Sequence, residues 1–424
     1  MLYSIKMQNF CTKFLHKVFA ERSSYTDMTN IRDYLKDRNG QAGDEYQKKI
    51  SAHKRKVRIV IIIIILALVA IAVGIKIYID NKSYSEYEIT DTRTISGAGS
   101  NKYFQFGDGM LVYTDDGISY IKGRETIWNQ AFEMKKPIVD VCGSTMAVCD
   151  LNTTTVYIYD TEGQKGKIDT MYPIIALEVS EQGVVAAITE DTETNRIEVF
   201  DREGNSIAAG QTYVTGEGCP IDIALSNDGT KLAASYIYVD GGSAKSKVVF
   251  YNYSEVGKNE VSRIVGGFNH YETTIVSRVE FLDNDTAAAF GDNIITIYSI
   301  KQKPEKISET KTDDTIKSIF YDEKYIGIVS ATASYEEPYN IKVYDVNGNE
   351  KMSMDTDFIY TGISMYEDRI IVYNDTEMKL FSISGRERYS GAITEGIRQV
   401  ICTDRADKYY IINGEYNIMS VKLK

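Results

Sequence analysis

The amino-acid sequence predicts an all-β protein, an eight-bladed β-propeller of four-stranded blades, preceded by one transmembrane helix. Three observations lead to this prediction. A charge-free apolar run occupies residues 59–75, and short strands rich in Val, Ile, Tyr and Thr follow it. These strands recur with a period of about 43 residues, which is what one four-stranded propeller blade needs. Seven blades are the alternative.

Residues 1–57 form a basic tail that we expect to lie in the cytoplasm, mostly without fixed structure. Residues 30–39 predict one short helix, because Asn30 can cap it and Gly40 can end it. This helix would fold on docking to a cytoplasmic partner. So short a segment is not stable as an isolated helix, so a nascent helix in a disordered tail is the alternative. The natural start, Met1 or Met28, is left open.

Residues 58–79 predict a transmembrane signal-anchor helix. The run from Ile59 to Ile75 holds 17 residues, eight of them isoleucine, and has no polar face, which argues against a buried core helix. Extended to Ile79, the helix covers about 31 Å, enough for a bilayer core of about 30 Å, with Lys76 near the headgroups. Because no small-residue cleavage pattern follows, we expect the anchor to stay uncleaved.

Charges beside the span predict its orientation. Four basic residues precede it: Lys54, Arg55, Lys56 and Arg58. Because basic flanks stay in the cytoplasm, we expect a single-pass protein of a bacterial cell membrane with its C-terminal domain outside. Residues 1–58 have a net charge of +7, which favours contact with anionic lipid of the bilayer. Residues 81–424 have a net charge of −19, which argues against binding to nucleic acid.

Residues 80–424 divide into repeats of an apolar strand, a small-residue strand, an aromatic strand and a variable fourth strand. The first apolar residues of seven repeats fall at 138, 175, 221, 275, 316, 359 and 397, and one copy precedes them. Small residues such as Ala186 and Ala187 fit near the axis, where blades converge. We expect the strand 84–90 to pair with the last blade, because this closes the ring and removes an open edge.

The segment SNDGTKLAAS at 226–235 resembles the strand–turn–strand of WD-repeat and YVTN-type propellers. The tracts 156–163, 197–204 and 341–348 are similar to the third strands of those blades. The chain departs from true WD repeats, because it contains no Trp-Asp pair. Its layout, including NIRDYLK at 30–36, resembles an uncharacterised family of signal-anchored propellers of unknown function, mostly from Gram-positive anaerobes. The resemblance implies this fold and brings no activity or site.

Candidate chemistry outside the membrane is sparse. Of three histidines only His270 lies beyond the span, so a histidine-built triad or metal site is nearly excluded there. Asp140, Glu178 and Glu280 fall on first strands, where they could ring the channel and hold Ca²⁺. The alternative is that these carboxylates are solvated or paired with neighbours such as Arg278.

Four cysteines also lie beyond the span: Cys142, Cys149, Cys219 and Cys402. No CxxC motif occurs, and cysteines at apolar strand positions behave as small core residues. We therefore expect free buried thiols. A disulfide remains the alternative, with Cys142 and Cys149 on adjacent strands as the conceivable pair.

Together these features predict a membrane-anchored, extracytoplasmic β-propeller that acts as a non-enzymatic binding or scaffolding module at the cell envelope. Its loops would contact an unknown protein, peptide or glycan at the cell surface. The alternative is a propeller enzyme, or a cofactor- or cation-binding protein, with a site at the channel mouth. The lack of a catalytic constellation weighs against an enzyme without excluding one, and Ca²⁺ in the channel is the one cofactor considered.

Overall fold

The computed structural model describes residues 41–80, 82–95, 101–114, 116–271, 274–403, 405–414 and 417–424. Within its N-terminal helix it places side chains over Ile50–Gly74. The helix expected at 30–39 lies outside the described residues. The chain divides after Asn81 into two compact units, which are described one at a time.

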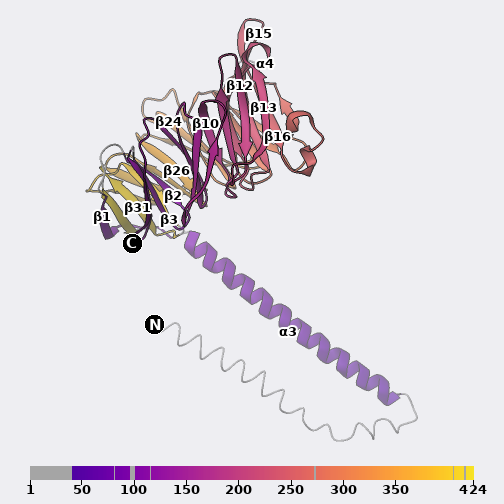
Figure 1. Ribbon diagram of the computed structural model, residues 1–424. Coiled ribbons are helices and arrows are strands. Elements are labelled where there is room, and N and C mark those ends of the chain that lie inside the picture. Colours follow the sequence, from indigo (N-terminus) through magenta and orange to yellow (C-terminus); the bar gives the residue numbers. More distant parts are fainter. Residues whose placement is uncertain are drawn as a thin grey trace. The chain divides into compact units, whose positions relative to one another are not determined.

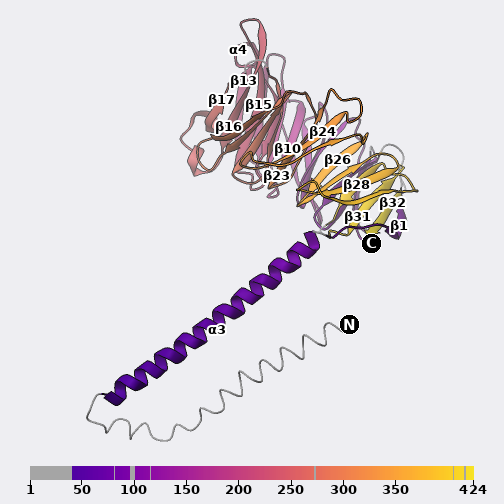
Figure 2. The ribbon, with the colours of Figure 1, turned by 180° about the vertical axis from the view of Figure 1, so that it is seen from behind.

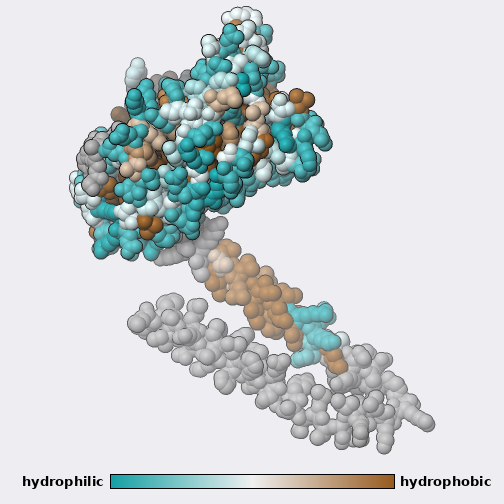
Figure 3. Space-filling model, in the orientation of Figure 1, coloured by the Kyte–Doolittle hydropathy of each residue, from teal (hydrophilic) through white to brown (hydrophobic). Residues whose placement is uncertain are grey.

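The first unit contains one described helix, α3 (Gln41–Asp80). Its segment Ile50–Gly74 is long and apolar enough to cross a membrane, and none of this segment is buried (Figure 1). The expected anchor residues Ile59, Ile75 and Lys76 all belong to α3. Figure 3 shows the apolar part of the helix as a brown band beside a short teal band. The exposed basic residues before the apolar run are Lys54, Arg55, Lys56 and Arg58.

The second unit is all-β and forms the eight-bladed propeller that the repeats predict. Its described strands make eight sheets of four strands each, and neighbouring strands in every sheet are antiparallel. In seven blades the strands pair in chain order. The second strand of a blade is typically buried and the fourth mostly exposed, as β7 (Thr145–Asp150) and β9 (Gly163–Asp169) illustrate. The core therefore lies between the blades and the outer edges face solvent.

The first four blades follow one another along the chain. Blade 1 consists of β2 (Lys102–Phe106), β3 (Gly109–Thr114), β4 (Gly117–Lys122) and β5 (Glu125–Ala131). Blade 2 consists of β6 (Pro137–Cys142), β7, β8 (Thr155–Asp160) and β9. Blade 3 consists of β10 (Ile174–Val179), β11 (Val185–Glu190), β12 (Thr194–Phe200) and β13 (Ser206–Tyr213). Blade 4 consists of β14 (Cys219–Leu225), β15 (Lys231–Asp240), β16 (Ser243–Asn252) and β17 (Ile264–Phe268). Short helical turns flank blade 4: α4 (Val214–Glu217), η1 (Glu255–Gly257) and η2 (Val261–Arg263).

The last four blades complete the ring. Blade 5 consists of β18 (Val276–Phe281), β19 (Thr286–Gly291), β20 (Ile294–Ser299) and β21 (Glu305–Lys311). Blade 6 consists of β22 (Ile316–Tyr321), β23 (Tyr325–Ala331), β24 (Tyr339–Asp345) and β25 (Glu350–Thr356). Blade 7 consists of β26 (Gly362–Tyr366), β27 (Arg369–Tyr373), β28 (Glu377–Ser382) and β29 (Glu387–Ala392). Blade 8 consists of β30 (Gln399–Cys402), β31 (Lys408–Asn413), β32 (Asn417–Leu423) and β1 (Tyr87–Thr94).

Blade 8 joins the two ends of the propeller chain. Strand β1 pairs antiparallel with β32, from Tyr87 opposite Leu423 to Thr94 opposite Asn417. Figures 1 and 2 both show indigo β1 beside the yellow strands of this blade. The strand expected at 84–90 overlaps β1, which begins three residues later and ends at Thr94. Strand β1 thus supplies the fourth, outer strand of blade 8, whose other three strands come from the C-terminal end of the chain.

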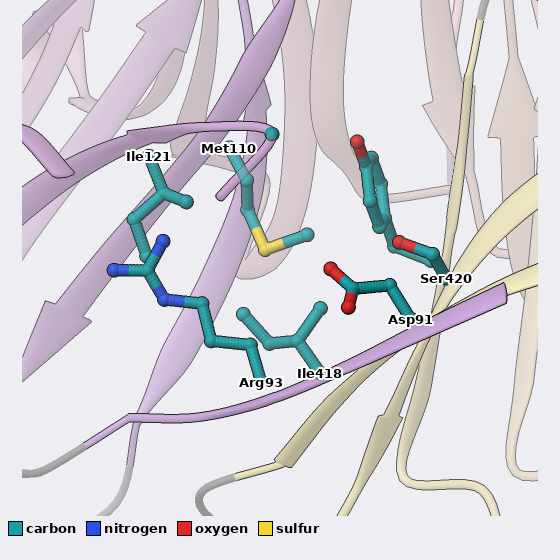
Figure 4. Close-up of a pocket in the computed structure, with 8 residues that line it drawn as sticks. Asp91, Arg93, Met110, Ile121, Ile418 and Ser420 are labelled. Atoms are coloured by element: carbon teal, nitrogen blue, oxygen red, sulfur yellow. The ribbon is translucent and has the colours of Figure 1, made fainter. Parts of the chain in front are cut away.

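A small pocket marks the seam between blade 8 and blade 1. Figure 4 shows side chains of β1, β3, β4 and β32 around it, namely Asp91, Arg93, Met110, Ile121, Ile418 and Ser420. Arg124 donates from Nε and Nη2 to the two carboxylate oxygens of Asp91, at 3.1 and 2.8 Å. Arg93 Nη2 donates to Thr126 Oγ1 at 2.6 Å. Polar contacts at the outer edge therefore link the first and last blades.

Small residues allow neighbouring blades to pack closely near the axis. Ala187 packs with Ala147 of the preceding blade, whereas Ala186 packs with Ala234 of the following blade. Successive side chains of a strand point to opposite faces, so each second strand serves two blade interfaces. At Gly327 an added Cβ would lie 2.1 Å from the ring of Phe320, so this close approach requires glycine.

Candidate functional site

The first strand of each blade is the innermost, and the first strands converge on an axial channel. The turns that end these strands bond to one another across blades. Gly107 N donates to Gly143 O at 2.9 Å, and Glu181 N donates to Asn227 O at 3.0 Å. Thr145 Oγ1 adds a bond of 2.8 Å to the carbonyl of Glu181. These contacts hold the inner ends of blades 1 to 4 side by side.

A cavity of about 400 Å³ lies at one end of this channel, and we call it the channel mouth. It is lined by Gln105, Gly107, Val141, Gly143, Ser144, Glu181 and Tyr366. Because these residues belong to blades 1, 2, 3 and 7, the lining reaches across the ring. The polar groups of the mouth are a carboxylate, an amide and two hydroxyls.

Four carboxyl groups lie on the first strands of consecutive blades, and we call them the acidic half-ring. They are Asp140 on β6, Glu178 on β10, Asp222 on β14 and Glu280 on β18. Each side chain is half-buried. The charges of Asp140, Glu280 and Asp222 all raise the pKa of Glu178. The four groups are therefore close enough to act on one another, although they come from four blades.

The two aspartates bind the following blade directly. Asp140 Oδ2 accepts a hydrogen bond from Val179 N at 2.6 Å, and Asp222 Oδ2 accepts one from Val279 N at 2.7 Å. Each bond joins the first strand of one blade to the first strand of the next. These carboxyl groups therefore connect blade 2 to blade 3 and blade 4 to blade 5.

The glutamate of blade 5 has a charged partner instead. Arg278 Nε donates to Glu280 Oε1 at 2.5 Å from the same strand. Tyr321 of blade 6 is also hydrogen bonded to Glu280. Arg278 lowers the pKa of Asp140, Glu178 and Asp222 in addition, so one guanidinium acts on the whole acidic half-ring.

Burial raises the pKa of three members of the acidic half-ring. It raises the pKa of Asp140 to about 6 and that of Asp222 to about 7, because the charged form loses hydration. Burial, and then the neighbouring carboxylates, raise the pKa of Glu178 well above its ordinary value. The backbone bonds from Val179 and Val279 act in the opposite direction and do not reverse these shifts.

The arrangement does not form a metal site in the part of the chain that the structure describes. No group of three or more His, Cys, Asp or Glu side chains there is placed to hold a metal ion. The three predicted ligands, Asp140, Glu178 and Glu280, do share the channel. They project from different blades, however, and Glu280 is paired with Arg278. Whether the channel binds Ca²⁺ stays a prediction.

Sequence reasoning missed Asp222. Register shifts at the start of β10, β14 and β18 change the spacing between the first apolar residue and the carboxyl group. Counting residues from the first apolar residue of each repeat therefore does not bring the four carboxyl groups to equivalent positions. The small residues of the second strand could have identified all four carboxyl groups. Each carboxyl residue pairs with one of them across the first two strands: Ala147, Ala186, Ser235 and Ala288.

The remaining candidates lie apart from the acidic half-ring. His270 Nε2 lies 2.8 Å from Glu309 Oε2 of blade 5. The cysteines at 142, 149, 219 and 402 are free thiols. Cys149 pairs with Ile138 across strands and Cys142 pairs with Thr145, so those two thiols are not opposite each other. Burial raises the pKa of Cys149 to about 12 and that of Cys402 to about 11, which keeps both protonated.

Comparison with known proteins identifies relatives without an established activity. DUF5711, a family of unknown function, matches residues 80–423. No curated protein matches the chain. The WD40 domain of Pan2 from Neurospora crassa is 8% identical with a TM-score of 0.41, covering 80% of this chain and 95% of that domain. Hsv2p from Kluyveromyces lactis is 11% identical with a TM-score of 0.46, covering 70% of this chain and 98% of Hsv2p.

Proposed function

We propose that this chain, which belongs to the DUF5711 family of unknown function, is a membrane-anchored propeller that binds a partner protein outside the cytoplasm. The observation that carries the proposal is an exposed apolar patch on blades 3 and 4. We call Tyr213, Val214, Ile221 and Val239 the blade 3/4 patch. Val239 is 75% exposed and Tyr213 is 56% exposed. Clustered exposed apolar side chains of this kind mark sites of protein association.

The patch stands at the free end of the longest hairpin. Strands β15 and β16 have ten residues each, and Val239 lies next to their turn. Helix α4 contacts β15, which brings Val214 to the same end, as both ribbon views show (Figures 1 and 2). Exposed acidic side chains near the patch are Glu193, Glu217 and Asp240, of which Asp240 is paired with Lys245 at 2.6 Å. The chemistry fits a protein with a small apolar surface rimmed by basic residues.

The direction of the strands places the patch away from the point where the chain enters the ring. Strand β1 begins at Tyr87, opposite the end of β32. In a four-stranded antiparallel blade, the third strand ends on the same face as the turn between the first two strands. Val239 and Tyr213 end a second and a fourth strand, so they lie on the opposite face. The patch is therefore open to a partner when the N-terminal side is tethered.

Anchoring in the membrane is supported by α3 and the charges beside it. Within Ile50–Gly74 the mean hydropathy reaches 3.1 over 18 residues, and basic residues precede the apolar run. Such flanks stay in the cytoplasm, which puts the propeller on the outer side of a bacterial membrane. Cysteine labelling in intact cells tests this topology. A membrane-impermeant maleimide should modify Tyr335→Cys in intact cells and Arg55→Cys only after permeabilisation; the reverse pattern would refute the orientation.

Site-specific photo-crosslinking tests the binding role. A photoreactive amino acid at Val239 in the full chain should give one discrete protein adduct in the native host. Ile307, an exposed isoleucine of blade 5, is the matched control position and should give none. Val239→Glu should abolish a pre-formed complex with the identified partner, and Ile307→Glu should leave it intact. Equal adducts at both positions, or an adduct with glycan alone, would contradict the proposal.

A further inference from the structure

The acidic half-ring has an unusual charge balance for a blade interface. Blades 2 to 5 contribute four carboxyl groups to a shared space, and Arg278 is the guanidinium that acts on all of them. Two of the carboxyl groups are themselves the connections between blades, through Val179 N and Val279 N. A change in their charge therefore acts directly where neighbouring blades meet.

We propose that the acidic half-ring is a pH-dependent interlock, which holds blades 2 to 5 together tightly in a mildly acidic medium and loosens them as the medium becomes neutral to alkaline. The interlock depends on whether these carboxyl groups are protonated or ionised. With carboxyl groups protonated, repulsion across the channel is small, and Asp140 and Asp222 still accept their backbone bonds through the carbonyl oxygen. With Asp140, Glu178 and Asp222 ionised, three negative charges face a guanidinium that is already paired with Glu280.

The sign of the pH effect follows from where the protons are held. The unfolded chain loses protons from aspartate near pH 4, whereas Asp140 and Asp222 have their pKa raised to about 6 and about 7 in the fold. Between these limits the folded chain binds more protons than the unfolded chain. The contribution to stability is therefore complete below about pH 4 and is lost as the pH rises to about 7.

Other titratable and charged groups face the half-ring from the elements packed against it. They are Arg278 and Glu280 on β18, Tyr321 on β22, Cys142 on β6, and Glu181 after β10. Burial and the neighbouring carboxylates raise the pKa of both Cys142 and Tyr321, so neither side chain becomes charged in the range of the effect. The titration between pH 5 and pH 8 thus belongs to the carboxyl groups.

Carboxylates on the surface contribute to the stability of the ring in the opposite sense, because their contribution is lost at low pH. Lys122 lowers the pKa of Asp108, and Lys167 lowers that of Asp169, through hydrogen bonds. Their contribution is present above about pH 4 and is lost as the pH falls through their lowered values.

Thermal unfolding of the full chain in nanodiscs tests the interlock. Trp128 is the single tryptophan and stacks on Tyr159, with ring centroids 5.5 Å apart, so its fluorescence reports on the ring. We expect the melting temperature to fall by about 5 °C from pH 5.5 to pH 8.0. The variant Asp140→Asn/Glu178→Gln/Asp222→Asn should lose most of this shift, and Glu203→Gln, an exposed carboxyl in blade 3, should retain it.

Infrared spectroscopy provides a readout that does not depend on how the triple variant folds. The C=O stretching band of protonated carboxyl groups should be present in the wild-type protein at pH 5.5 and should disappear by pH 8.5. The single variant Asp222→Asn should reduce this band, and Glu203→Gln should not. An unchanged melting temperature across this range, or the absence of the band at pH 5.5, would overturn the proposal.

Discussion

The two halves of the propeller connect neighbouring blades with different chemistry. Blades 2 to 5 carry carboxyl groups on their first strands, whereas in the other half, which we call the neutral half, blades 6 and 8 reach the next blade with neutral first-strand side chains. Ser318 Oγ lies 2.7 Å from Tyr360 OH, and Gln399 Nε2 donates to Tyr103 O at 2.9 Å. The same backbone arrangement therefore supports first-strand contacts that titrate in one half and neutral first-strand contacts in the other.

Two of the arginines that act between blades, Arg369 and Arg278, differ in their environment. Arg369 of blade 7 is completely buried and donates to the carbonyls of Thr403 and Arg405 of blade 8, at 3.0 and 3.1 Å. The side chain of Arg278 is 54% exposed and is paired with a carboxylate. Neutral carbonyls around a buried guanidinium and a carboxylate beside an exposed one should respond differently when the cation is removed.

The largest effect is expected for Arg369→Met. Loss of the guanidinium leaves two buried carbonyl groups without these donors, and we expect a loss of about 3 kcal/mol in the free energy of unfolding. The loss should be equal at pH 5.5 and pH 8.0, as measured by urea unfolding followed by the fluorescence of Trp128. Arg405→Met, at an exposed arginine, is the control and should have little effect. A strong pH dependence would remove the distinction between the halves.

The second largest effect is expected when a carboxyl group is introduced into the neutral half. Ser318→Asp places a half-buried carboxylate between blades 6 and 7, where Ser318 now bonds to Tyr360. We expect a loss of about 2 kcal/mol at pH 8.0 and a smaller loss at pH 5.5, because the protonated form costs less to bury. The isosteric control Ser318→Asn should show no such pH dependence. Equal losses for both variants would mean that shape, not charge, separates the two halves.

Arg278→Met is expected to have a smaller effect, because solvent already screens this side chain. We expect a loss of about 1 kcal/mol at pH 8.0, discounted for its exposure, and nearly none at pH 5.5. The same urea titration at both pH values measures it. Combining Arg278→Met with Glu280→Gln should restore part of the stability at pH 8.0, since the carboxylate paired with Arg278 is then absent. Failure of this rescue would assign Arg278 a packing role instead.

The smallest effect is expected at the seam between blades 8 and 1, where the ring closes. Asp91 and Arg124 form a two-point ion pair there, at the outer edge of blades 8 and 1. Because the pair is exposed, Arg124→Ala should not change the urea midpoint measurably. A clear loss would show that the seam depends on this ion pair more than on the pairing of β1 with β32.

Much of the fold follows from local sequence signals, and the candidate site follows only in part. The period of the strands predicts eight blades, because each blade repeats one pattern of an apolar and a small-residue strand. Asp140, Glu178 and Glu280 were recognisable as first-strand residues. Asp222 was not, because the register shift between Pro220 and Asp222 moves it relative to the apolar residue used for alignment.

The sequence by itself determined the repeat, the acidic character of the propeller and the apolar helix, because these depend on composition and on spacing along the chain. Only the tertiary structure decided which blades touch through which groups. Asp140 and Val179 are 39 residues apart, and Asp222 and Val279 are 57 apart, yet each pair is hydrogen bonded. Closure of the ring brings such residues together, and the burial that follows determines which carboxyl groups keep their protons.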